Sequence, residues 1–220
     1  MRGAAPLALA AALAACGGKL PETRYYQLAA AQAPAPAAPA RAGGPVLVLE
    51  PLSADDAYDD ERIVYRTGPY RLDYYQYHRW SAAPGVMVTD LLEQALERSG
   101  RFRAVVRELA DGAPAVLGGR VRAIEEVDES RTRWLGRIAV ELTLKDAETG
   151  AVLWTRELAE TEPLTAQTPE GLAQALSVAM GRIAARAIPE IVAHTRLAPA
   201  PAPASASDRS REARRRVIRR

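Results

Sequence analysis

The chain has 220 residues, which is enough for one folded domain with additional terminal segments. Its 29 Lys and Arg residues nearly balance 27 Asp and Glu residues, and a net charge of +2 argues against a nucleic-acid-binding protein with a broad basic face. The one cysteine excludes an internal disulfide, so packing must stabilise the fold.

The first fifteen residues have the pattern of an export signal. Arg2 gives a positive start, and residues 4–13 form an apolar segment shorter than the roughly 20 residues that span a bilayer. Leu13, Ala14 and Ala15 then precede Cys16 as in a bacterial lipobox, where the thiol receives acyl chains. The sequence therefore predicts a signal peptide over residues 1–15 and a covalent lipid on Cys16, with no other cofactor. The alternative is an ordinary secretory signal with an incidental cysteine.

A lipidated Cys16 would anchor the chain to a membrane, because two or more acyl chains hold stably. Gly17 and Gly18 follow it, without the Asp that tends to follow the cysteine in lipoproteins retained in the inner membrane. We therefore expect the periplasmic face of the outer membrane of a Gram-negative bacterium. Residues 16–45 are expected to hold the lipidated N-terminus, a short extended segment at 25–28 and a disordered Ala/Pro-rich tether. If residues 25–28 pair with the domain, the tether is instead a long surface loop.

The folded domain is predicted over residues 46–196. Residues 46–49 are typical of a strand buried on both faces, and residues 62–80 of two strands joined at Gly68, where Gly supplies a positive φ before Pro69. Apolar spacing predicts a helix from Pro84 to Gly100. Strands are expected at 102–106, 116–127, 137–145 and 152–158.

A last helix is expected to begin at residue 168, and Pro189 either ends it or kinks it before a further turn or two over residues 190–196. Two amphipathic helices and a sheet with one apolar face together predict an α+β fold. It would be a two-layer domain with a mostly antiparallel sheet and both helices packed on one face.

Acidic residues cluster between the first two predicted strands of the domain. The cluster lacks the ligand spacing and the glycine of an EF-hand loop, so a solvated acidic loop is favoured and no metal site is predicted. Its members are Asp55, Asp56, Asp59, Asp60 and Glu61.

Most of the tyrosines lie in residues 62–80. The simple interpretation is a hairpin that covers one edge of a small core, since a phenol can pack its ring and keep its hydroxyl in water. The functional interpretation is an interaction surface, because aromatic and Arg side chains are favoured at interface hot spots. The candidate contact residues are Tyr65, Arg66, Tyr70, Arg71, Tyr74, Tyr75, Tyr77, Arg79 and Trp80.

A longer run of residues carries a family resemblance. Its members are Ile63, Val64, Tyr65, Arg66, Pro69, Tyr70, Leu72, Tyr74, Tyr75, Tyr77, Arg79, Trp80, Pro84, Ser99, Gly100, Arg101 and Phe102. Their order resembles the ABC-type transport auxiliary lipoproteins, and the resemblance runs from about residue 25 to about residue 188. It implies a non-catalytic component of an MCE-type lipid-trafficking system, with an MCE-domain protein and an ABC permease and ATPase as partners.

Sequence patterns of an enzyme are missing. His78 and His194 do not stand in a ligand or triad spacing, and Cys16 should be blocked by lipid. There is no G-x-S-x-G elbow and no phosphate-binding loop of the G-x-x-x-x-G-K-[ST] type. We therefore expect no catalysis, and a function that depends on binding.

Residues 197–220 are expected to be disordered, with an Ala/Pro-rich part followed by an Arg-rich tail. The tail suggests an alternative function, a structural envelope lipoprotein that attaches to the cell wall or another anionic surface. Direct lipid carriage and a homo-oligomeric ring also remain open. The tail arginines are Arg209, Arg211, Arg214, Arg215, Arg216, Arg219 and Arg220.

Overall fold

The computed structural model describes residues 21–30, 44–108 and 112–197. Three predictions lie outside these residues: the signal peptide with Cys16, most of the Ala/Pro-rich tether, and the Arg-rich tail. No helix in the described ranges is long and apolar enough to cross a membrane.

A single sheet is built around one long strand, β7 (Ala115–Asp128). One edge of β7 pairs along its length with antiparallel β8 (Trp134–Asp146), and β9 (Val152–Pro163) continues the sheet. The other edge of β7 pairs in turn with three short parallel strands, which are β2 (Val46–Leu49), β3 (Ser53–Ala54) and β4 (Arg62–Gly68). One strand therefore organises the whole sheet.

Three further strands extend the sheet on the side of the short strands. β5 (Arg71–Trp80) pairs antiparallel with β4, and β1 (Arg24–Tyr26) lies parallel to β5. β6 (Ala104–Val106) lies parallel to β2. Because β1 belongs to the sheet, the chain between β1 and β2 connects two strands of one domain.

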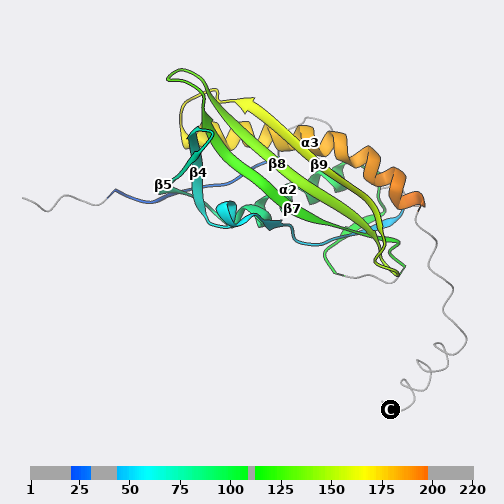
Figure 1. Cartoon of the computed structure of the whole chain (residues 1–220). Helices are drawn as coiled ribbons and strands as arrows, with labels where there is room; N and C mark the ends of the chain where they lie inside the picture. The colour runs from blue at the N-terminus through cyan, green and yellow to red at the C-terminus, as the bar shows by residue number, and fades with distance from the viewer. Residues whose placement is uncertain (1–20, 31–43, 109–111, 198–220) are drawn as a thin grey trace, which may run out of the picture.

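Two helices, α2 (Pro84–Arg98) and α3 (Pro169–Leu197), contact each other on one face of the sheet, and α3 runs beside the long strands in Figure 1. Their apolar stripes are buried, with Leu92 and Leu96 of α2 and Leu176 and Ile183 of α3 fully enclosed. Gly136 on β8 lets α3 approach, because an added Cβ would lie 3.1 Å from the Ala175 Cβ. The core therefore lies between this helix layer and the sheet.

The start of α2 is held against Leu52, the residue directly before β3. The Thr89 hydroxyl accepts a hydrogen bond from the Leu52 amide at 2.9 Å and donates to the Gly85 carbonyl. A Cβ added at Gly85 would lie 2.2 Å from the Leu52 carbonyl oxygen, so this close approach requires glycine. A short 3-10 helix, η2 (Asp56–Tyr58), then leads from β3 toward β4.

The predicted α+β class is confirmed, and antiparallel pairs make up most of the paired residues. Gly100 adopts a positive φ of 61° after α2, and Thr168 caps α3 through the Gly171 amide, both as expected. The prediction of a positive φ at Gly68 is wrong, because positive φ occurs at Gly100, Gly112 and Gly150 among the described residues. Helix α3 also continues past Pro189, where Ile191 and Val192 remain buried against the sheet.

The outer edge of β9 is covered by side chains of α3. The Arg182 guanidinium donates to the Thr161 carbonyl at 2.9 Å, and Arg186 donates to the Ala159 carbonyl at 3.2 Å. Both arginines also pair with Glu160, which lies between those two carbonyls in sequence. This arrangement satisfies strand carbonyls that would otherwise be free to pair with another strand.

Candidate functional site

The β4–β5 hairpin positions the nine candidate contact residues. Pro69 and Tyr70 form its turn, and Tyr70 is fully exposed, with 100% of its surface accessible. Arg71 follows it and is also exposed, with its guanidinium paired to Asp73 at 2.7 Å. A bare aromatic ring beside an arginine makes this tip the part of the hairpin most suited to meet another molecule.

Trp80 does not belong with these contacts. Only 1% of its surface is exposed, and it is part of the main hydrophobic cluster. It lies at the last position of β5, where its amide donates to the Glu61 carbonyl at 2.6 Å. The interpretation of Trp80 as a contact residue is corrected, because its ring packs in the core of the domain.

Tyr65, Tyr74 and Tyr75 are half-buried and are used within the domain. The Tyr74 hydroxyl donates to the Ala57 carbonyl at 3.2 Å, and the Arg62 guanidinium lies 4.2 Å from the centre of its ring. The rings of Tyr65 and Tyr75 lie 5.0 Å apart. The hairpin-cover interpretation therefore holds for these three tyrosines, and the contact interpretation stays a prediction for the exposed tip. Tyr77 and Arg79 are half-buried near the far end of β5.

Glu125 of β7 is completely buried and fully paired. Its carboxylate accepts hydrogen bonds from the Tyr58 hydroxyl at 2.7 Å, from Arg66 at 3.1 Å and from Arg137 at 3.0 Å. Burial and the hydrogen bond to Glu125 together raise the pKa of Tyr58 to about 12. The candidate contact Arg66 is therefore occupied in holding β4 to β7.

Glu126, the next residue, is also completely buried but lacks a cationic partner among the described residues. The Tyr75 hydroxyl donates to one carboxyl oxygen at 2.8 Å, and the other oxygen has no hydrogen-bond partner. Burial, together with the nearby Asp128 carboxylate, raises the pKa of Glu126 to about 7. The neutral acid is thus the form that suits this site.

Both glutamates were missed as candidate residues from sequence. A signal was present, because two consecutive carboxylates in a strand must point to opposite faces, so at least one faces the packed side. Glu126 lies opposite Gly136 of β8, so the two residues point to the same face of the sheet. A Cβ added at Gly136 would contact Ala175 of α3, so this is the face that the helices cover. Glu125 points to the opposite side, toward η2.

Two aspartates of the acidic loop form ion pairs within the domain, where the sequence predicted a solvated loop. The Asp55 carboxylate pairs with Arg120 and Arg122 at 3.3 and 3.4 Å, and Asp60 pairs with Arg62 at 2.8 Å. The hydrogen bonds from Arg62 lower the pKa of Asp60. Within the described ranges, no three potential ligands come together in a way that could hold a metal ion.

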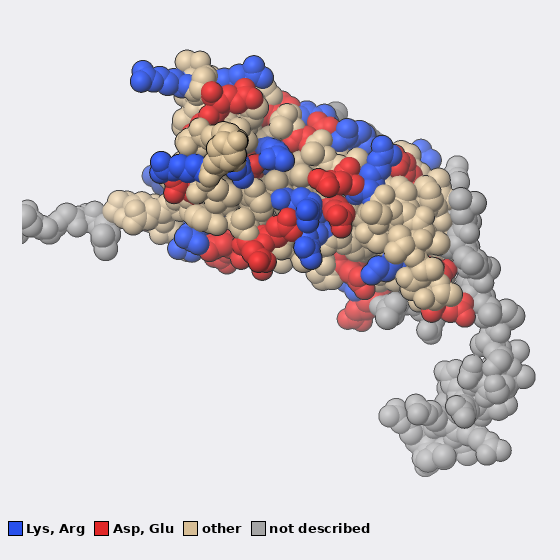
Figure 2. Space-filling model, viewed as in Figure 1, with Lys and Arg blue, Asp and Glu red and all other residues tan. Residues whose placement is uncertain are grey.

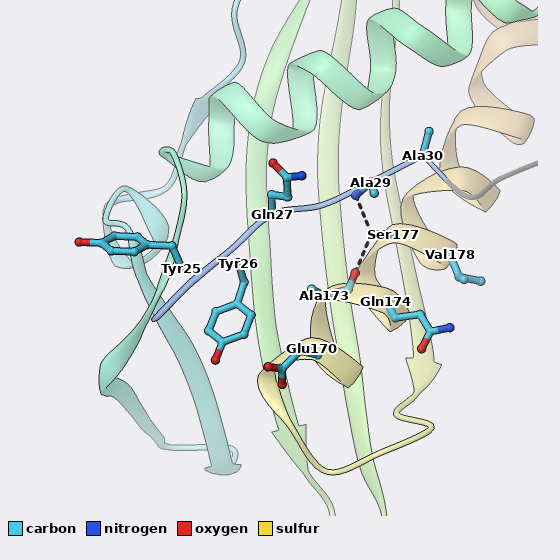
Figure 3. A pocket seen from close by; sticks show the side chains of 10 residues that line it. All are labelled: Tyr25, Tyr26, Gln27, Ala29, Ala30, Glu170, Ala173, Gln174, Ser177 and Val178. Atoms are coloured by element: carbon cyan, nitrogen blue, oxygen red, sulfur yellow. Dashed lines mark hydrogen bonds between the residues drawn. The ribbon is translucent and has the colours of Figure 1, made fainter. Parts of the chain in front are cut away.

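A surface groove of about 570 Å³ lies between β1 and α3 (Figure 3). Tyr25, with 62% of its surface exposed, and Tyr26 line it from one side, and Glu170 and Ser177 line it from α3. Burial, followed by the Glu170 charge, raises the pKa of Tyr26. The groove is open to solvent and lies outside the core, so it adds an accessible apolar surface beside the first strand.

Charges of both signs are interspersed on the face seen in Figure 2. Many charged side chains of the described residues form ion pairs, such as Arg182 with Glu160 and Glu162. The described residues on this one face therefore present no broad region of a single charge sign.

Comparisons with known proteins agree with this fold. A crystal structure of a Xanthomonas campestris protein of the DUF330 family superposes with a TM-score of 0.66 at 19% identity, covering 79% of this chain and 98% of that chain. A crystal structure of an uncharacterized protein gives 0.64 at 14% identity, covering 78% and 99%. At these identities the likeness shows the fold alone.

No curated protein sequence matches the chain. The family model of the ABC-type transport auxiliary lipoprotein component matches residues 26–187, which begin in β1 and end within α3. That span contains most of the described domain, including the tyrosine hairpin, α2 and the part of α3 up to residue 187. The chain therefore belongs to the ABC-type transport auxiliary lipoprotein component family.

Proposed function

We propose that the protein is a non-catalytic docking component of an MCE-type ABC transport system that moves phospholipid between membranes. Acyl chains on Cys16 would hold it at the periplasmic face of the outer membrane. The tip of the β4–β5 hairpin would bind the MCE-domain protein, with Tyr70 entering a pocket of that partner and Arg71 at its rim.

The single observation that carries this proposal is the fully exposed ring of Tyr70. An aromatic side chain held outside the fold at a two-residue turn gains nothing from packing, whereas its neighbours Tyr74 and Tyr75 are engaged within the domain. Family membership supports association with an ABC system, and the MCE partner is the more specific step that we add.

Docking is tested by co-purifying the full chain with an MCE-domain protein in mild detergent. We expect Tyr70→Ser to reduce the recovered partner at least about tenfold, since a hot-spot residue contributes about 2 kcal/mol or more. Tyr25→Ser is the matched control, because it removes another exposed tyrosine from β1. Equal recovery with Tyr70→Ser and the native chain would contradict the proposed surface, and no recovery with the native chain would contradict the proposed partner.

The membrane anchor and the alternative function have separate tests. Cys16→Ser, or treatment with globomycin, should block lipoprotein processing and release the chain from the membrane fraction. Deletion of residues 207–220 should leave partner binding and envelope integrity unchanged. Loss of envelope integrity on that deletion would instead favour a structural lipoprotein that binds the cell wall through its Arg-rich tail.

A further inference from the structure

The β4–β5 hairpin pairs with β1 on its outer side and is joined to the central strand β7 by few backbone pairs. Only Val64, Tyr65 and Arg66 of β4 pair with β7, opposite Glu125, Glu126 and Val127. At this same position the two buried glutamates reach back to the hairpin. Glu125 binds Arg66 of β4 on one face, and Glu126 binds Tyr75 of β5 on the other. Two side-chain attachments therefore reinforce a short backbone connection.

These two attachments respond differently to the loss of a proton. Glu125 is a carboxylate with two arginines and a phenol around it, so its charge is compensated. Glu126 has one phenol donor and one unpartnered oxygen, and its nearest acidic neighbour, Asp128, also has a buried oxygen without a partner. A proton on Glu126 allows it to donate toward Asp128, and its loss would leave two carboxylates together in a buried site. Ionisation would strengthen the hydrogen bond from Tyr75, but burial and the Asp128 charge outweigh that gain, so the charged form favours an opened hairpin in which Glu126 meets water.

Among the described residues, no Lys, Arg or His forms a salt bridge with Glu126. Tyr65 of β4 lies opposite it in register, and Tyr75 of β5 is its hydrogen-bond donor. His78 of β5 stands behind the Tyr75 ring, at 5.5 Å between ring centres. Gly136 is its neighbour on β8, and Glu170 in the first turn of α3 is another acidic group on this side of the domain.

We propose that Glu126 is a pH-sensitive attachment for the β4–β5 hairpin, which holds the hairpin on β7 when protonated and loosens it when ionised. The attachment itself does not depend on the proposed docking function. Its consequence for docking does, because the hairpin carries Tyr70 at its tip. The result would be a contact surface that is ordered below neutral pH and more mobile above it, while Glu125 keeps the hairpin from detaching altogether.

The test is amide hydrogen exchange on the full chain in mild detergent at about pH 6 and about pH 8.5, with each rate divided by its intrinsic rate. Protection of the β4 and β5 amides should fall about tenfold or more between the two conditions, because the carboxyl ionises between them. Amides of β8 and β9 serve as the internal reference and should change less than about twofold. An equal change throughout the sheet, or no change in the hairpin, would overturn the proposal.

Three variants assign the effect. Glu126→Gln keeps the acceptor for Tyr75 and cannot ionise, so the fall in protection should disappear. His78→Gln should still show the decrease in protection of the β4 and β5 amides. If this variant showed no decrease, the effect would belong to the histidine and the proposal would be overturned. Asp128→Asn should move the fall to lower pH, because it removes the neighbouring negative charge. Carboxyl-carbon NMR of the native chain gives a direct measurement, and a Glu126 midpoint below about pH 5.5 would also overturn the proposal.

These outcomes are separable from the proposed function. If exchange shows the pH-dependent loosening but no MCE-domain protein co-purifies, the attachment stands and the docking function fails. If the partner binds equally at both pH values while the hairpin loosens, the attachment stands and its predicted effect on docking is excluded.

Discussion

The backbone amide of Ala29 donates a hydrogen bond to the Ser177 hydroxyl at 3.1 Å, across 148 residues of sequence. The same hydroxyl donates to the Ala173 carbonyl at 2.6 Å, so Ser177 links the segment after β1 to helix α3 (Figure 3). Ala29 and Ser177 both line the groove between β1 and α3, so this contact joins its two sides. It also fixes the N-terminal segment, which is the part of the domain nearest in sequence to the predicted lipid anchor.

Replacing Ser177 with Ala should loosen this segment without unfolding the domain. The change leaves the Ala29 amide without its acceptor and should cost about 1–3 kcal/mol locally. Hydrogen exchange of the Ala29 amide should accelerate, while β8 amides remain protected. Unchanged exchange at Ala29 would contradict the importance of this bond.

Glu126→Gln should raise the free energy of unfolding at high pH. The folded-state pKa of Glu126 is about 7, above its ordinary value of 4.5, so its contribution is fully present below about pH 4.5 and is lost as pH rises to about 7. Urea unfolding should therefore show the variant and the native chain alike near pH 4.5. Above pH 7 the variant should be more stable by up to about 3 kcal/mol. A difference that does not change with pH would contradict this prediction.

Glu125→Gln should have the opposite effect. It removes the charge of a fully buried carboxylate that pairs with Arg66 and Arg137, and it should destabilise the fold by about 3 kcal/mol. Urea unfolding of the two single variants side by side provides the comparison. Equal destabilisation by Glu125→Gln and Glu126→Gln would show that the two sites do not differ as described.

Gly85→Ala should destabilise the domain by about 1–3 kcal/mol, because its Cβ would lie 2.2 Å from the Leu52 carbonyl oxygen. Gly181→Ala is the matched control. It lies on the exposed side of α3 with no atom within 4 Å of the added Cβ, so it should stabilise the helix by about 0.5–1 kcal/mol. Thermal unfolding should shift in opposite directions for the two variants.

Trp80→Ala should cost about 3–5 kcal/mol, as expected for removing a fully buried aromatic side chain. Tyr70→Ser should change the unfolding free energy by less than about 0.5 kcal/mol, because the native ring is fully exposed. Chemical unfolding of both variants checks the assignment of one residue to the core and the other to the surface. A large loss of stability in Tyr70→Ser would contradict that assignment.

Local patterns were enough to predict the long strands and both helices. The alternation of Ile138, Val140, Leu142 and Leu144 identifies β8, and the capped apolar stripe from Thr168 identifies α3. Local patterns could not show that β2, β3 and β4 pair one after another with β7, since short strands carry no signal for a distant parallel partner. Helix α3 continues past Pro189 because tertiary packing of Ile191 outweighs the local cost of proline.

The candidate site was predictable only in part. The tyrosine run identifies the hairpin, but composition does not distinguish Tyr70, which is bare, from Trp80, which is enclosed. That difference depends on how the end of β5 packs into the core. The contrast between Glu125 and Glu126 likewise requires the register of β7 with β4, which brings Arg66 to one carboxylate and Tyr75 to the other.

The arginines of α3 that cover β9 have a consequence for assembly. A second chain could add a strand beside β9 only by first displacing Arg182 and Arg186 from the carbonyls of Thr161 and Ala159 and from Glu160. Growth of a continuous intermolecular sheet from this border is therefore disfavoured. At a crowded membrane surface, neighbouring molecules can contact the β9 edge without adding strands to it and forming fibres.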